Sequence, residues 1–282
     1  MQRRAIAACL GLVAVAACSS DSALMRQRRQ EALIGSIRQA LLESEVAEKS
    51  AVLATTDEES RALSLEAKRL ASRVNELRGE LRPLIEVDGR RAEIEKLDAF
   101  DAAWANLEDV DRRLLALAVA NTNLKAAQLS SREGADALDR LVEALAEMEA
   151  TAEDPATIRV LSQTAVAALR AQQLLLVHIP TADAAEMARL EVRMSALSAE
   201  VKHNLATAAR GGQVSPARAA AASAAWKEYR RVSAAVIRLS RANSNVISSD
   251  VSVHEKRQAT QACIAALAAL LDAVRSGPQA AR

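Results

Sequence analysis

The sequence predicts an all-α protein that folds as an elongated, antiparallel, up-down-up-down four-helix bundle built from a duplicated helical hairpin. Hydrophobic residues make up 50% of the chain, but aromatic residues only 1%. The apolar content is mostly Ala, Leu and Val, a mixture that favours helices over strands. There are only 8 Gly and 5 Pro among 282 residues, so long uninterrupted helices are expected.

The N-terminus has the features of a bacterial signal peptide. Arg3 and Arg4 precede a short apolar run at residues 5–17, which ends in Val-Ala-Ala-Cys at residues 15–18. This tetrapeptide resembles the lipobox of bacterial lipoproteins. We therefore expect residues 1–17 to be removed and Cys18 to carry the lipid, which anchors the chain in the bacterial cell envelope facing the periplasm. Ordinary signal cleavage and an uncleaved membrane anchor are the alternatives.

Sparse helix-breaking signals divide the remaining chain into four long segments. The breaks lie at Pro83 with Asp88-Gly89, at residues 151–155, at residues 211–216 and at Gly277-Pro278. Ser215 followed by Pro216 is a suitable N-cap and first helical residue. Short connections make neighbouring helices antiparallel. The prediction is one domain over 18–282, with helices at about 22–84, 90–151, 156–210 and 216–275.

The second and fourth segments contain an internal repeat. Residues 103–124 align without gaps on residues 225–246, so that Trp104 corresponds to Trp226 and Asn121 to Asn243. In both copies apolar residues recur at spacings of three and four, which is typical of a helix face directed at a bundle core. We expect the two stripes to lie side by side, with the two tryptophans as packing anchors.

Polar residues are expected at one level of this bundle. Counting at 1.5 Å per residue from the end far from the anchor places Thr56, Asn121, His178 and Asn243 at similar heights. These residues either fix the register of the helices, as buried Asn residues do in coiled coils, or line a small polar cavity that binds a ligand. In the first case, replacing both Asn residues by Leu should stabilise the bundle.

The sequence offers little support for an enzyme. Glu200 and His203 form an E-x-x-H pair, but a second such pair, which a di-metal bundle needs, is missing. Nucleophile-elbow, phosphate-loop and zinc-type motifs are also missing. After removal of Arg3 and Arg4, 35 Lys and Arg face 36 Asp and Glu, so nucleic acid is not an expected partner. We predict no catalytic residues, no cofactor, no metal and, with Cys263 alone in the mature chain, no internal disulfide.

Three segments resemble a known family. Residues 115–130, 238–252 and 48–60 are similar to the four-helix-bundle periplasmic sensor domain of methyl-accepting chemotaxis proteins. The resemblance implies an extracytoplasmic helical sensor that binds a small molecule or a partner protein. Full receptors continue through a second membrane span into a signalling hairpin, whereas this sequence ends at Arg282.

The leading hypothesis is thus a lipid-anchored, sensor-like bundle that binds a small ligand or a membrane receptor. Its candidate ligand-binding residues are Asn121, Asn243, His178 and Thr56. The alternative is a structural or spacer lipoprotein that binds no ligand. The sequence leaves the oligomeric state open, although sensor bundles of the family it resembles commonly form parallel homodimers.

Overall fold

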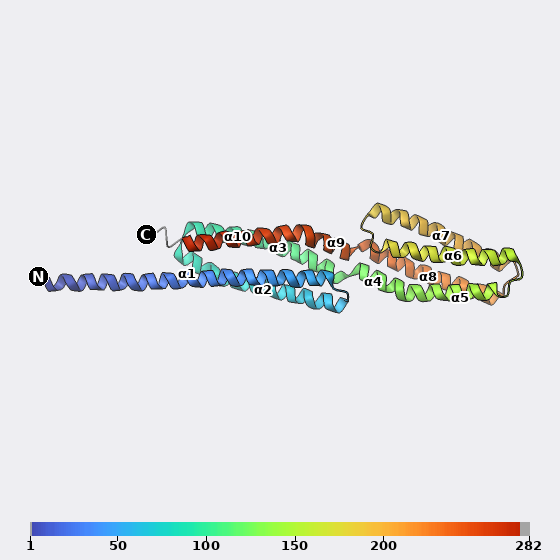
Figure 1. The fold of residues 1–282 in the computed structure, drawn as a ribbon, viewed down its shortest axis with the longest axis horizontal. Coiled ribbons are helices and arrows are strands. Elements are labelled where there is room, and N and C mark those ends of the chain that lie inside the picture. Colours follow the sequence, from blue (N-terminus) through green and yellow to red (C-terminus); the bar gives the residue numbers. More distant parts are fainter. Residues whose placement is uncertain (1, 277–282) are drawn as a thin grey trace. The chain divides into compact units, whose positions relative to one another are not determined.

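The computed structural model describes the backbone of residues 2–276 and the side chains of residues 22–276. All regular structure in this range is helical, which confirms the all-α bundle class. The predicted signal peptide and Cys18 lie outside the residues whose side chains are described. Figure 1 shows the elements in chain order: α1 (Gln2–Leu53), α2 (Asp57–Asp88), α3 (Arg91–Ala120), α4 (Thr122–Leu129), the π-helix η1 (Ser130–Gly134), α5 (Ala135–Glu149), α6 (Pro155–His178), α7 (Ala184–Arg210), α8 (Pro216–Ala242), α9 (Ser244–Val251), the π-helix η2 (Ser252–Lys256) and α10 (Arg257–Ser276).

The helices form two compact units, which corrects the prediction of one domain over 18–282. Unit 1 comprises residues 1–119 and 248–282, and unit 2 comprises residues 120–247. Two of the predicted long helices, 22–84 and 156–210, are each a hairpin of two helices.

Strong N-caps explain both unexpected hairpins. Thr56 begins α2 by accepting a hydrogen bond from the Glu59 backbone N–H, and three acidic residues follow in the first turn. Asp183 begins α7 by accepting from the N–H groups of Ala185 and Glu186. Capping side chains and acidic first turns satisfy the free N–H groups of a new helix, so these polar stretches start helices and do not lie within them.

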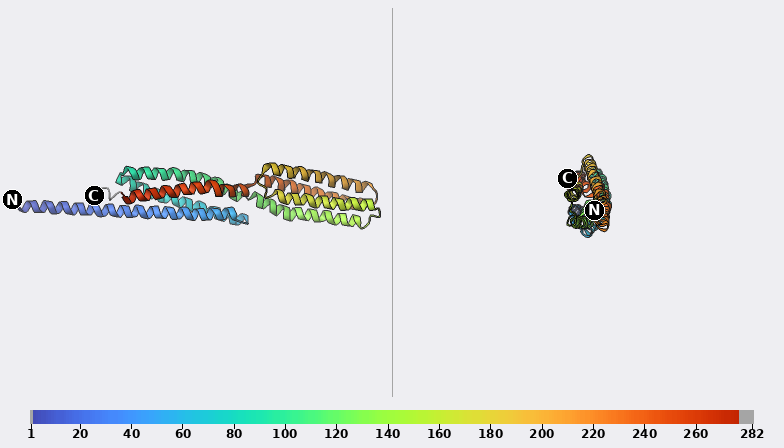
Figure 2. Two further views of the ribbon diagram at one scale, coloured as in Figure 1. Left: turned by 45° about the horizontal axis from the view of Figure 1, so that its top comes forward. Right: turned by 90° about the vertical axis from the view of Figure 1, so that its right-hand side faces the viewer.

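Unit 1 is an antiparallel arrangement of α1, α2, α3 and α10 around an apolar core (Figure 2). Trp104 and Phe100 of α3 are among its largest fully buried side chains. The Ser44 hydroxyl donates to the Ala67 carbonyl and links α1 to α2, and Arg78 of α2 pairs with Asp101 of α3. Gly89 ends α2 with a φ of 65°, a left-handed conformation that glycine adopts without strain.

Unit 2 packs α5, α6, α7 and α8 around a second core. Alanine and leucine side chains from all four helices surround Trp226 and Tyr229 of α8. A further cluster, which includes Leu175, Leu190 and Val236, extends this core. Many core positions of α6 and α8 are alanine, which lets α6 pack closely against α7 and α8 pack closely against α5.

The repeat extends beyond the two tryptophan segments. Helix α9, η2 and α10 each begin 122 residues after α4, η1 and α5, respectively, which is the offset that relates Trp104 to Trp226. Both stripes face cores, as predicted. They do not share one core, however, because Trp104 is buried in unit 1 and Trp226 in unit 2. The expectation of two stripes side by side was wrong, because each copy contributes to a bundle of its own.

Candidate functional site

The two predicted asparagines mark breaks in helices. Asn121 lies between α3 and α4 with a φ of 48°, and Asn243 lies between α8 and α9 with a φ of 50°. They are the only described non-glycine residues with positive φ. Asn tolerates this left-handed conformation better than other side chains with a Cβ, for which it costs about 1–2 kcal/mol. Leu at these positions would be strained, which removes the basis for expecting a double Leu variant to be more stable.

Reciprocal hydrogen bonds join the two segments that follow these breaks. The Thr122 backbone N–H donates to Ser244 Oγ at 2.9 Å, and the Ser244 N–H donates to Thr122 Oγ1 at 2.9 Å. Asn123 and Asn245 likewise exchange backbone N–H to side-chain Oδ1 bonds of 3.1 and 3.2 Å. Each bonded pair is separated by 122 residues, so the duplicated segments cap each other.

The asparagine side chains also bond to one another. Asn245 Nδ2 donates to Asn121 Oδ1 at 2.9 Å, and Asn123 Nδ2 donates to Asn243 Oδ1 at 2.7 Å. Asn123 Nδ2 further donates to the Ile179 carbonyl at 2.7 Å. Buried amides that are paired in this way hold the backbone in one arrangement.

His178 is fully buried at the end of α6 and is bonded through both ring nitrogens. Nδ1 lies 2.9 Å from Ser240 Oγ, and Nε2 lies 2.9 Å from Glu191 Oε1. Arg241 donates two hydrogen bonds to Glu191, of 2.7 and 2.9 Å. These bonds from Arg241, followed by the bond from His178, lower the pKa of the Glu191 carboxyl. Helices α6, α7 and α8 are thus joined by a polar network.

The predicted layer is therefore only partly assembled. Unit 2 brings Asn121, Asn243 and His178 into neighbouring hydrogen-bonded clusters, whereas Thr56 is the exposed N-cap of α2 in unit 1. Internal partners satisfy the polar groups of these clusters, and this favours a structural function in holding register. A ligand-binding role for Asn121, Asn243, His178 and Thr56 stays a prediction.

Unit 2 also contains a pocket beside the His178 network, with which it shares Glu191. A cavity of about 250 Å³ lies between α7 and α8, with Ala171 of α6 also lining it. Tyr229 and Trp226 are stacked, with ring centroids 4.9 Å apart, and both line the pocket. The chain has four aromatic residues in all, two Trp, one Tyr and one Phe. The other lining residues are Glu191, Met194, Ser195, Ser198, Arg230, Ser233, Ala234 and Ile237.

The indole of Trp226 distinguishes this pocket from the matching part of unit 1. Trp226 is only 4% exposed, and its Nε1–H has no acceptor among the described residues. In unit 1 the corresponding Trp104 Nε1–H donates to Asn75 Oδ1 at 2.8 Å. An unpaired buried N–H costs about 1–3 kcal/mol, so a bound molecule that accepted this hydrogen bond would recover that energy.

Tyr229 adds a fixed polar group to the same wall. Its hydroxyl donates to Gln172 Oε1 at 3.0 Å, and burial raises the pKa of Tyr229 to about 12, so the phenol stays protonated. Arg230 lies at the exposed edge without an ion pair to any described residue. The lining thus includes two stacked aromatic side chains, one of which has a buried N–H without an acceptor, and an exposed cation that no described side chain pairs. Aromatic walls with a few polar groups are typical of small-molecule sites.

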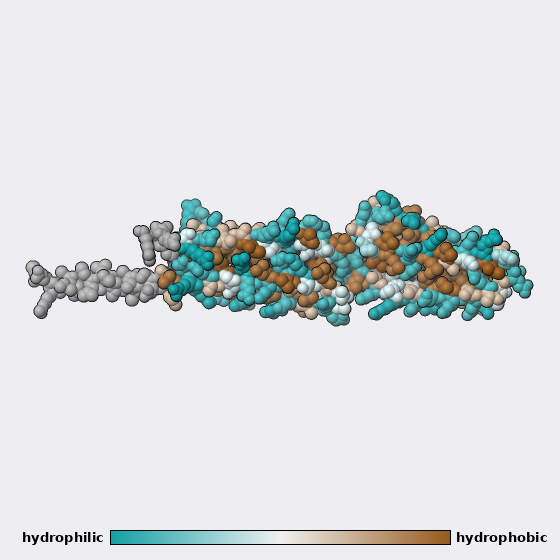
Figure 3. Space-filling model, in the orientation of Figure 1, coloured by the Kyte–Doolittle hydropathy of each residue, from teal (hydrophilic) through white to brown (hydrophobic). Residues whose placement is uncertain are grey.

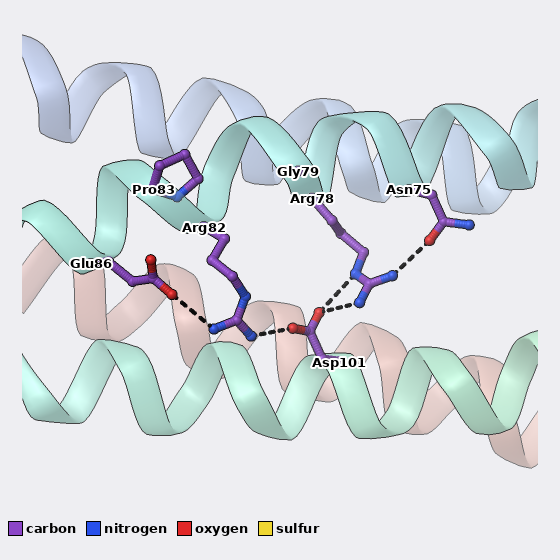
Figure 4. Close-up of a pocket in the computed structure, with 7 residues that line it drawn as sticks. All are labelled: Asn75, Arg78, Gly79, Arg82, Pro83, Glu86 and Asp101. Carbon is purple, nitrogen blue, oxygen red and sulfur yellow. Dashed lines mark hydrogen bonds and ion pairs between the residues drawn. The ribbon is translucent and has the colours of Figure 1, made fainter.

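Unit 1 has a hollow of about 360 Å³ between α2 and α3, shown in Figure 4. Arg78 and Arg82 converge there on Asp101, with bonds of 2.7 and 2.5 Å. Arg82 also bonds to Asp98 and Glu86. These arginines are already paired, so the hollow is best explained as an ion-pair network that joins α2 to α3.

No cluster of three or more His, Cys, Asp or Glu side chains that could hold a metal occurs in the described part of the chain. Glu200 and His203 are both exposed on α7. Helical periodicity did not reveal the Trp226 pocket, because it marks Trp226 only as a packing anchor. The clustering of Trp226 and Tyr229 in a chain almost without aromatics was the available signal.

Comparison with solved structures identifies the fold. The chain is similar to the sensor domain of the histidine kinase sensor TorS from V. parahaemolyticus, with a TM-score of 0.54 and 12% sequence identity. The match covers 91% of this chain and 99% of that domain. The chain thus shares the helical fold of that domain. No family model and no curated protein matches the sequence, so the resemblance to chemotaxis sensors is supported at the level of a helical sensor fold only.

Proposed function

We propose that this chain is an extracytoplasmic, lipid-anchored sensor module that binds a small ligand in the Trp226 pocket of unit 2. The unpaired, buried Trp226 Nε1–H is the observation that most directly supports it. The similarity to a sensor domain supports the same kind of function.

Ligand binding should stabilise unit 2 selectively. A panel of small polar metabolites, each with a hydrogen-bond acceptor, is screened by thermal unfolding followed through tryptophan fluorescence. A ligand at a hundredfold excess over its Kd stabilises the native state by about 2.7 kcal/mol. Trp226→Phe keeps the aromatic wall but removes the donor, so it should weaken binding roughly tenfold in titration calorimetry, in line with the loss of about one hydrogen bond.

Trp104→Phe is the matched control, since Trp104 lies in unit 1 and already donates to Asn75. It should leave the affinity of unit 2 unchanged. If no compound in the panel raised the melting temperature, the small-ligand proposal would fail. If a ligand bound equally well to Trp226→Phe, its site would lie elsewhere.

Lipid anchoring depends on Cys18, the residue after the predicted cleavage site. Replacing Cys18 by Ser removes the thiol that carries the lipid, and the protein should move from the membrane fraction to the soluble fraction when expressed in a bacterium with lipoprotein processing. Cys263→Ser is the control, because Cys263 is buried in the core of unit 1. Continued membrane association of Cys18→Ser would refute the anchor.

A spacer without a ligand is the second candidate. The observation that favours it is the set of hydrogen bonds that join Asn121 to Asn245 and Asn123 to Asn243, which we call the asparagine junction. These internal bonds occupy the polar groups and fix the helix breaks. A protein that only holds a fixed structure needs such a junction but has no use for an unpaired indole N–H. The ligand screen therefore distinguishes the two candidates.

A further inference from the structure

A second hollow in unit 2 is lined by two arginines that no acidic side chain pairs. It lies between α6 and α7 and has a volume of about 430 Å³. Arg170 of α6 and Arg193 of α7 are both exposed, and neither forms an ion pair with a described residue. The other lining residues are Gln173, Leu174, Ala196 and Leu197. None of these residues lines the Trp226 pocket, so the two sites are separate.

The local sequence offers neither arginine a partner. A helical residue meets the side chains three and four positions away. Helix α6 contains no acidic residue at all. The positions three and four away from Arg193 are Arg189, Leu190, Ala196 and Leu197. Glu191 is the nearest acidic residue in the sequence, and it is already bonded to Arg241 and His178. Two cations therefore share this hollow without an internal counter-charge.

Unit 1 contains the same helical hairpin 127 residues earlier in the chain. The N-caps of α2 and α7, Thr56 and Asp183, are separated by this number of residues. Buried positions of the two hairpins recur at the same offset: Leu41, Ser44, Val74 and Leu81 match Ala168, Ala171, Val201 and Ala208. The residues that match Arg170 and Arg193 are therefore Glu43 and Glu66.

The two hairpins carry opposite charges at this place. In unit 1, Arg69 donates hydrogen bonds of 2.8 and 2.6 Å to Glu66. These bonds, with a further contribution from the charge of Glu43, raise the pKa of Arg69. One cation thus serves two carboxylates. The residue of unit 2 that matches Arg69 is Ala196, whose methyl group provides no charge for the two arginines beside it.

A counter-ion from outside the chain would complete the hollow of unit 2. Each guanidinium presents a fork of N–H donors that matches phosphate oxygens. A phosphate monoester carries a charge of about −1.5 to −2 at pH 7, so one compact group matches both cations, whereas a single carboxylate matches one. We propose that the hollow between α6 and α7 binds the phosphate group of a phosphate monoester through Arg170 and Arg193.

Apolar side chains next to the hollow indicate what the rest of the ligand contacts. Val166 lies one helical turn before Arg170, and Val177 lies one turn after Gln173. Both valines are about half exposed, at 47% and 50%. In Figure 3, apolar side chains gather over the part of unit 2 that α6 crosses in Figure 1. An ester with an apolar group should therefore bind more tightly than inorganic phosphate.

Phosphorus NMR titration of the Cys18→Ser chain, which cannot carry the lipid, tests the site at constant ionic strength. Phenyl phosphate should bind more tightly than inorganic phosphate, and dimethyl phosphate, with a single charge, more weakly. Arg170→Gln with Arg193→Gln should weaken the binding of phenyl phosphate about tenfold or more, since two exposed charge pairs are lost. Both side chains are exposed, so the fold should be retained. Arg159→Gln on α6, outside the hollow, is the matched control and should bind like the parent.

Transfer of the unit 1 charges provides a second test. Arg170→Glu and Arg193→Glu combined with Ala196→Arg reproduce the arrangement of Glu43, Glu66 and Arg69, and should abolish binding while circular dichroism shows a folded chain. Trp226→Phe should leave phosphate binding unchanged, because Trp226 does not line this hollow. Binding that persists without both arginines, or that is lost with Trp226, would place the phosphate elsewhere and overturn the proposal.

A phosphate monoester group occurs on soluble metabolites and on phosphatidic acid. Co-sedimentation of the Cys18→Ser chain with phosphatidylcholine vesicles that contain phosphatidic acid, but not with phosphatidylcholine alone, would identify a lipid headgroup as the source. Binding of phenyl phosphate without co-sedimentation would identify a soluble ester. If neither phosphate probe nor the vesicles bound the chain, the proposal would be wrong, whatever the outcome of the ligand screen at the Trp226 pocket.

Discussion

Replacing Lys256 by Met is expected to destabilise unit 1 by about 3–5 kcal/mol, because it leaves the acidic side chains of Glu48 and Asp111 in the core without their cation. Lys256 is 2% exposed, and its ammonium lies 2.5 Å from Glu48 Oε2. The same ammonium donates to Asp111 Oδ1. Glu48 is 1% exposed and Asp111 is 8% exposed. The three residues form a buried triad of titratable side chains that joins α1, α3 and η2.

The geometry of η2 explains how a lysine enters this core. A π-helical turn adds a residue to the helix and redirects the side chains that follow, and Lys256 is the last residue of η2. In unit 2 the corresponding turn ends in Gly134, whose missing Cβ would lie 3.6 Å from Val232 Cγ1. The triad is therefore a feature of unit 1 alone, and only unit 1 should respond to its removal.

Urea unfolding measures the loss of stability that Lys256→Met causes in unit 1. With Trp226→Phe as background, Trp104 is the only tryptophan and reports on unit 1. With Trp104→Phe as background, Trp226 reports on unit 2, whose stability should not change. Adding Glu48→Leu and Asp111→Leu to Lys256→Met should restore stability to within about 1 kcal/mol of the parent, since apolar replacements of buried ion pairs are often neutral or stabilising. A loss below about 1 kcal/mol in the single variant would show that the triad contributes little.

The secondary structure was largely predictable, but the arrangement of the helices was not. The low content of Gly, Pro and aromatic residues predicted helices, and Ser215 with Pro216 does begin α8. The two hairpin turns were missed although their caps are visible in the sequence, at Thr56 and at Asp183. Counting along straight rods placed Thr56 in a polar layer because it assumed that the helix continued.

The candidate site was predictable only in part. The repeat correctly pointed to Asn121 and Asn243, but sequence periodicity alone could not show that both adopt positive φ and end helices. The Trp226 pocket differs from the matching region of unit 1 in the hydrogen-bond acceptor that each indole N–H finds. Asn75 faces Trp104, and no described acceptor faces Trp226. Such a difference between two copies arises from tertiary contacts and is not visible in a local pattern.

Unit 1 is also expected to lose stability as the pH rises from about 4.5 to 8, because its folded state keeps Glu48 protonated while the unfolded chain does not. Burial is the main cause that raises the pKa of Glu48, from 4.5 to about 8, while Lys256 opposes it and Asp111 reinforces it. Between these two values the folded state holds a proton that the unfolded chain has released, so folding is favoured most below pH 4.5 and progressively less above it. A tenfold difference in proton affinity between the folded and unfolded states corresponds to about 1.4 kcal/mol, so the full effect amounts to a few kcal/mol.

The Glu48→Gln variant isolates this contribution, because glutamine resembles protonated glutamate in shape and does not titrate. The difference in unfolding free energy between the parent and Glu48→Gln, measured through Trp104 at several pH values, should change steadily between pH 4.5 and 8 and become constant above about pH 9. Unit 2, followed through Trp226, should show no such difference, because Glu48 lies in unit 1. Parallel pH profiles for the parent and the variant would mean that Glu48 is ionised in the folded protein, held as a carboxylate by Lys256.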